Sequence, residues 1–213
     1  MQALEKVAIH TIWIPMVLVL LLAIIAVLKI IDVEKLKGYA LAIFNKGFLE
    51  DEVEEDTSFF SSFYSLLLIF SSIVLALVIS LFVSEIRQHS FVTFSSFLYI
   101  LGVVFGYFVI KSLLEVLLTK IFLIEKQVRY YLISKFGYLY SISFFLLVFF
   151  ILFQFGPLNF SSLIRIISVL FFISFILHLV NNKKLIFSEL FYFILYLCAF
   201  EIGPLLILFK MIL

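Results

Sequence analysis

The chain has 213 residues, of which 65% are hydrophobic and 14% are charged, and its formal net charge is +1. A water-soluble domain of this composition would expose large apolar patches, so the sequence excludes that class and predicts an integral membrane protein in contact with the lipid bilayer. The near-zero net charge argues against nucleic acid as a partner. Because the apolar runs reach about 17 residues or more, the spanning elements are expected to be α-helices. We therefore predict an all-α fold, a polytopic transmembrane helix bundle of about six spans, in a single integral membrane domain over residues 1–213.

The first predicted span covers residues 11–30, and a long hydrophilic stretch, residues 32–56, follows it as a loop. In the first half of this loop apolar residues recur at helical spacing, namely Leu36, Tyr39 or Ala40, Ile43 and Phe44, which predicts a short interfacial amphipathic helix after the first span. The second half is acidic, and we interpret it either as a solvated loop or as a docking patch for a basic partner. The acids of that patch are Glu50, Asp51, Glu52, Glu54, Glu55 and Asp56.

Three further spans are expected at residues 58–83, 91–117 and 139–155, with residues 120–135 as an interfacial connection. In the first of these spans, serines fall mostly on one helical side, and small hydroxyl residues let two helices approach closely in lipid. The second contains a GxxxG pair, which is also typical of close helix crossing. Helix packing is therefore predicted at Ser62, Ser65, Ser72, Gly102 and Gly106.

The last two predicted spans are residues 163–180 and 185–211. The polar run Asn181–Lys184 separates them, and we interpret it as a tight turn. A connection this short makes the two spans an antiparallel hairpin, so residues at equal distances from the turn should lie at similar depths in the membrane.

One carboxylate, Glu201, lies among apolar residues in the last span. An ionisable group inside the membrane is a functional hypothesis that requires a partner. Arg165 lies at nearly the same distance from the turn, so we predict an intramembrane ion pair between Glu201 and Arg165. Pro204 lacks a backbone N–H and predicts a helix kink beside the carboxylate.

Basic residues are distributed unevenly between the two ends of the predicted bundle. Of the 15 lysines and arginines, four lie toward the side of the chain termini and the others lie toward the side of the first loop. The positive-inside rule then places the loop of residues 32–56 in the cytoplasm and both termini outside. The four basic residues on the terminal side are Lys6, Arg87, Arg165 and Lys210.

Two segments carry a resemblance to a known family: FNKGFL at residues 44–49 and YLCAFEIGPLLILFK at residues 196–210. The chain resembles a family of small six-span inner-membrane proteins from Bacteroidota, known only as a domain of unknown function, and Glu201 and Pro204 look like its C-terminal signature. The resemblance implies a bacterial inner-membrane protein with periplasmic termini and an accessory role in an envelope machine for secretion or gliding. It brings no catalytic residue, substrate or cofactor.

The cysteine and histidine residues do not form a pattern that is typical of an enzyme. The single cysteine, Cys198, excludes a CxxC pair, and the three histidines lie in separate segments without a zinc-binding spacing. We therefore expect no metal, no cofactor and no enzymatic activity. Our interpretation is a non-enzymatic inner-membrane subunit or scaffold of a larger envelope complex, with other membrane proteins as partners. The alternative is a small proton- or solute-coupled transporter that uses Glu201 and Arg165.

Overall fold

The computed structural model describes residues 13–54, 62–86, 93–122, 125–156 and 158–188. Within these ranges every secondary-structure element is an α-helix, so the predicted all-α class is confirmed. The described helices are α1 (Trp13–Ile31), α2 (Val33–Ala40), α3 (Lys46–Glu54), α4 (Ser62–Ile86), α5 (Phe94–Phe122), α6 (Glu125–Phe155) and α7 (Phe160–Ser188).

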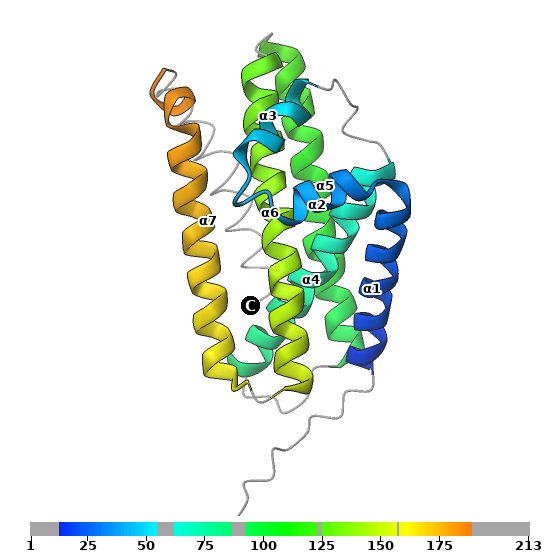
Figure 1. Ribbon diagram of the computed structural model, residues 1–213. Coiled ribbons are helices and arrows are strands. Elements are labelled where there is room, and N and C mark those ends of the chain that lie inside the picture. The colour runs from blue at the N-terminus through cyan, green and yellow to red at the C-terminus, as the bar shows by residue number, and fades with distance from the viewer. Residues whose placement is uncertain (1–12, 55–61, 87–92, 123–124, 157, 189–213) are drawn as a thin grey trace, which may run out of the picture.

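The long helices of the described chain form one bundle (Figure 1). α4, α5 and α6 lie in the middle, with α1 on one flank and α7 on the other. α1 packs against α4, α4 packs against both α5 and α6, and α7 packs against α6. The short helices α2 and α3 also pack against α6, toward the end of the bundle where α5 ends and α6 begins. We call this end the cap end.

α1, α4, α5 and α6 each contain a segment that is long and apolar enough to cross a membrane, as expected of a transmembrane bundle. In α7 the described apolar segment, Phe160–Ser174, is shorter. The predicted sixth span, residues 185–211, lies mostly outside the described residues. The four segments of sufficient length are Trp13–Ile31, Ser62–Ser84, Phe94–Leu113 and Ile133–Phe155.

The turn predicted at Asn181–Lys184 is wrong, because α7 continues through these residues as far as Ser188. The run contains neither Gly nor Pro, and Asn and Lys cost less than ~1 kcal/mol each in a helix interior. The end of the apolar segment is therefore not the end of the helix. The depth comparison between Arg165 and Glu201 depended on this turn and loses its basis.

The connection predicted at residues 120–135 is mostly helical as well, since α5 ends at Phe122 and α6 begins at Glu125. α6 has 31 residues, which at ~1.5 Å per residue amounts to about 46 Å and exceeds a hydrocarbon core of ~30 Å. The apolar segment of α6 begins only at Ile133. The first turns of α6 and the end of α5 therefore lie outside the apolar segments, at the cap end of the bundle (Figure 1).

The hydrophilic stretch after α1 folds into two short helices rather than one amphipathic helix and a loop. Leu36 and Ile43 are buried, as the predicted apolar face requires, whereas Phe44 is exposed. The interpretation of the acidic half as a solvated loop is wrong as far as Glu54, because Lys46–Glu54 forms α3. A helix can fix each acid in a defined direction, which a loop cannot.

The predicted packing residues differ from one another in their surroundings. Ser72 on α4 is fully buried, and its hydroxyl donates a hydrogen bond to a backbone carbonyl of its own helix at 2.7 Å. Ser62 and Ser65 are exposed. Among the described residues nothing lies within 4 Å of a Cβ placed on Gly102 or Gly106. The close crossing predicted at this glycine pair is therefore absent from the described part of the bundle.

Candidate functional site

A buried charge cluster joins α2, α3 and α4 at the cap end. Glu52 on α3 is 3% exposed, and its Oε1 atom lies 3.2 Å from Nζ of Lys35 on α2. The hydroxyl of Tyr64 on α4 donates a hydrogen bond to the same oxygen. A buried carboxylate is tolerated when it is paired, and here a cation and a hydroxyl satisfy it. We call these three residues the Glu52 cluster.

Helix caps place the charged residues of this cluster. Asp32 Oδ1 accepts a hydrogen bond from the backbone N of Lys35 at 2.9 Å, which starts α2 and sets Lys35 in its first turn. Asn45 Oδ1 accepts a backbone N–H at 3.3 Å in the first turn of α3. Glu52 then follows Leu49 by three residues, on the same face of that helix. Because Leu49 is fully buried, the face that carries Glu52 is turned toward the bundle.

Tyr39 on α2 forms the aromatic centre of the same region and is 2% exposed. Its ring makes edge-on contacts with Phe48 on α3, Tyr64 on α4 and Tyr140 on α6, at centroid distances of 5.1, 5.9 and 5.7 Å. Such edge-to-face pairs are favourable beyond the area that they bury. One side chain thus ties the two short helices to two spanning helices.

α2 and α3 approach α6 closely at Gly137. A Cβ placed on this glycine would lie 2.6 Å from Cδ2 of Leu49 and 3.7 Å from Cε1 of Tyr39. One turn further along α6, Ser141 Oγ donates a hydrogen bond to the carbonyl of Ala40 at 2.9 Å. The missing side chain at Gly137 therefore makes room for α3. This contact was not predicted, and its one sequence signal is an isolated glycine inside a helical pattern.

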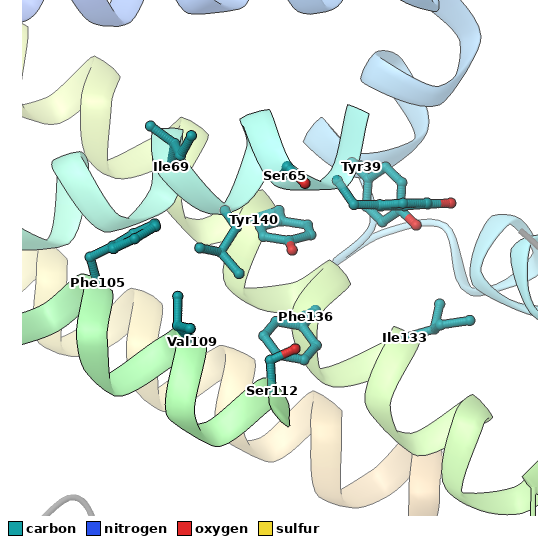
Figure 2. A pocket seen from close by; sticks show the side chains of 11 residues that line it. Tyr39, Ser65, Ile69, Phe105, Val109, Ser112, Ile133, Phe136 and Tyr140 are labelled. Carbon is teal, nitrogen blue, oxygen red and sulfur yellow. The ribbon is translucent and has the colours of Figure 1, made fainter. Parts of the chain in front are cut away.

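A cavity of about 170 Å³ lies beside the Glu52 cluster, between α4, α5 and α6 (Figure 2). In Figure 2, Ile69 and Phe105 lie at one side of the cavity and Tyr39 at the other, with the ring of Tyr140 between them. The cavity therefore has an apolar part and a hydroxyl-bearing part. Its lining residues are Tyr39, Tyr64, Ser65, Leu68, Ile69, Phe105, Val109, Ser112, Ile133, Phe136 and Tyr140.

The acids of the predicted docking patch differ in their exposure. Glu52 is turned into the bundle and paired there, which corrects its assignment to the patch. Glu50 and Asp51 are exposed on α3. A charge run in a sequence does not distinguish these positions, because the difference arises only when the helix packs. Glu54 is the last residue of α3, and Glu55 and Asp56 lie outside the described residues.

Arg165 lies in the second turn of α7 and is exposed. Its Nε atom donates to the carbonyl of Ser161 at 3.2 Å, and its Nη2 atom donates to Oγ of Ser162 at 3.4 Å. These contacts stay within its own helix. Glu201 and Pro204 lie outside the described residues, so the ion pair and the kink stay predictions.

The cap end gathers hydrogen-bonding groups rather than metal ligands. The Glu52 cluster supplies one carboxylate, one amine and one hydroxyl, and these bind one another. Within the described ranges, no group of three or more His, Cys, Asp or Glu side chains could hold a metal ion. The arrangement is thus suited to holding helices together and to hydrogen bonding inside the neighbouring cavity.

The chain matches a known family over nearly its whole length. The match covers residues 14–212 and so includes the helices of the cap end as well as the spanning helices. It confirms the resemblance to a domain of unknown function. No curated protein and no solved structure matches the chain. The chain belongs to the family described as Domain of unknown function (DUF4271).

Proposed function

We propose that the chain is a non-enzymatic integral membrane subunit that presents the acidic face of α3 to a basic partner protein. The observation that supports this proposal is the way α3 is anchored. Leu49 and Glu52 are buried against the bundle, while Glu50 and Asp51 are exposed. The helix is therefore fixed on one side and carries negative charge on the other.

A charged helix that is ordered before binding has an advantage over a charged loop. A loop loses conformational entropy when a partner orders it, and this loss weakens the complex. α3 is already ordered by the Glu52 cluster and by the contact between Leu49 and Gly137. Its exposed carboxylates can then steer a basic surface into place and disfavour acidic ones.

The resemblance to Bacteroidota proteins extends the proposal to a location. The chain would be a six-span subunit of the bacterial inner membrane with both termini in the periplasm, and it would serve an envelope machine for secretion or gliding. Lys35 and Lys37 are on α2, at the cap end, and Lys111 is in the half of α5 that leads to the cap end. Under the positive-inside rule these basic residues favour a cytoplasmic cap end. The partner would then be a cytoplasmic protein or the cytoplasmic part of another membrane protein.

Cysteine labelling tests this orientation. With Cys198 replaced by Ser, a cysteine at Asn159, between α6 and α7, should react with a membrane-impermeant maleimide added from the periplasm. A cysteine at Lys37 on α2 should react only after lysis, because Asn159 and Lys37 are both exposed but lie at opposite ends of the bundle. Labelling of Lys37 from the periplasm would reverse the proposed orientation.

Co-purification tests the docking face. After gentle detergent extraction, mass spectrometry should find a stoichiometric basic partner. The double variant Glu50→Gln/Asp51→Asn should retain about fivefold less of it, because two exposed charges each contribute up to ~1 kcal/mol and salt screens them. Glu34→Gln is the matched control, since Glu34 is an exposed acid of α2 in the same region.

The opposite results would change the proposal. If the native chain and the double variant Glu50→Gln/Asp51→Asn recovered the same amount of partner, α3 would be a structural element without a docking role. A chain that purifies alone and monodisperse would contradict the subunit proposal. If that chain also carried proton or solute flux in proteoliposomes, and Arg165→Gln abolished the flux, the transporter that uses Arg165 and Glu201 would replace it.

A further inference from the structure

We propose that the cavity beside Tyr140 binds the ring of a neutral, lipid-soluble compound that carries carbonyl oxygens, of the quinone class. The compound would reach the cavity from the bilayer, between α4 and α5. The proposal concerns binding and involves no redox step. The cavity differs from the acidic face of α3, although Tyr39 and Tyr64 contact α3 and also line the cavity.

Hydroxyl groups without partners are the first observation. Tyr140 is 4% exposed and lines the cavity, yet within the described ranges its hydroxyl makes no hydrogen bond. Ser65, which is exposed, and Ser112, which is partly exposed, also line the cavity and make no hydrogen bond within those ranges. Other serines of α4 behave differently, since Ser72 and Ser80 donate to carbonyls of their own helix at 2.7 and 2.8 Å. A hydroxyl that borders a cavity and has no protein partner is satisfied by whatever fills the cavity, so a ligand oxygen suits this site.

The exposure of the lining residues shows where the cavity opens. Tyr140 and Ile133 on α6 are buried, whereas Ile69 on α4 is 37% exposed and Phe105 on α5 is 38% exposed. Ile69 and Phe105 both lie within segments that are apolar enough to cross the membrane. In a membrane, the side of the cavity between α4 and α5 would therefore face hydrocarbon, and a compound dissolved in lipid would enter there.

The lining determines the kind of compound. None of the 11 lining residues carries a charge, so a phosphate or carboxylate would find no counterion there. Five of the lining residues are aromatic, and their faces and edges suit a flat ring. Hydroxyl donors suit carbonyl acceptors. The volume of about 170 Å³ is close to the ~150 Å³ of a cavity known to hold benzene, so one ring with its carbonyl oxygens fits, while larger ring substituents and an apolar tail lie at the open side between the helices.

The test compares two probes with the same tail. Decyl-ubiquinone has a ring with oxygen substituents, and decylbenzene has the same chain length and no oxygen. Each is titrated into the full chain in phosphatidylcholine nanodiscs, and Tm is followed. Decyl-ubiquinone should raise Tm in a saturable way, whereas decylbenzene should produce a much weaker effect. Equal effects of the two probes would overturn the proposal and leave an unspecific apolar hollow.

Three variants test whether decyl-ubiquinone raises Tm by binding in this cavity. Tyr140→Phe removes one oxygen and should raise the half-saturating concentration of decyl-ubiquinone about three- to tenfold, as expected for the loss of one hydrogen bond. Val109→Trp fills the cavity and should abolish saturation. Tyr99→Phe on α5 is the matched control, because Tyr99 is exposed and does not line the cavity. Unchanged binding by a Tyr140→Phe protein with normal Tm would also overturn the proposal.

Discussion

Replacing Lys35 by Met should lower the free energy of unfolding by about 2–3 kcal/mol, because the carboxylate of Glu52 would lose its cation while it stays buried. Loss of one partner of a fully buried pair costs ~3–5 kcal/mol. The side chain of Lys35 is 23% exposed, so water can replace part of its interaction with Glu52. The expected loss is therefore smaller than for a fully buried pair. Reversible unfolding in mixed micelles of dodecyl maltoside and SDS measures the difference.

Two further variants separate the charge from the packing. Lys37→Met removes an exposed lysine of the same helix and should change stability by less than ~0.5 kcal/mol. The double variant Lys35→Met/Glu52→Leu removes both charges and should recover much of the loss, because a buried pair can be replaced by apolar side chains at little cost. A double variant as unstable as the sum of the single ones would show that Lys35 and Glu52 do not stabilise α3 as a pair.

Replacing Gly137 by Val should destabilise the chain by about 1–3 kcal/mol, the usual cost of overpacking a filled core. The new Cβ would lie 2.6 Å from Cδ2 of Leu49, which is fully buried and has little room to move. Gly102→Ala is the control, because nothing among the described residues lies within 4 Å of the added methyl group, and the better helix propensity should stabilise the helix by up to ~1 kcal/mol.

The partner residue gives a sharper test of the Gly137 contact. In the background of Leu49→Ala, the space near Gly137 opens, so Gly137→Val should cost less than it does in the native chain. Thermal unfolding of the four proteins of this cycle in detergent measures the coupling. If Gly137→Val cost the same in both backgrounds, the close approach of α3 to α6 would not be limited by these two side chains.

Hydropathy predicts the class of the protein and the first span well, because the apolar run of α1 coincides with the helix. It fails where helices continue past the membrane. Asn181–Lys184 and residues 120–135 are polar, and polar residues without Gly or Pro are as compatible with a helix in water as with a turn. The sequence pattern therefore marks where the apolar segments end and does not mark where α5, α6 and α7 end.

The candidate site was the harder part to predict, because it depends on contacts between segments that are distant in the chain. Glu52 stands among acids of the same kind, and only the packing of Leu49 on α6 turns it inward. The motif at Gly102 and Gly106 matched a known pattern, yet among the described residues close approaches to side chains occur at Gly38 and at the isolated Gly137 instead. Tyr140 carried no signal at all, since an unsatisfied hydroxyl is a property of its surroundings.

Tyr64 belongs to two structures at once: its hydroxyl binds Glu52, and its ring lines the cavity. A compound that displaces this ring must change the bond that fixes α3, and thereby the free energy of anything bound to the outer face of that helix. Thermodynamic linkage makes the relation reciprocal, so a protein bound to α3 would change the affinity of the cavity by the same factor. Through Tyr64, the concentration of a compound in the lipid would thus influence the binding of a protein in the aqueous phase, and the bound protein would influence the binding of the compound.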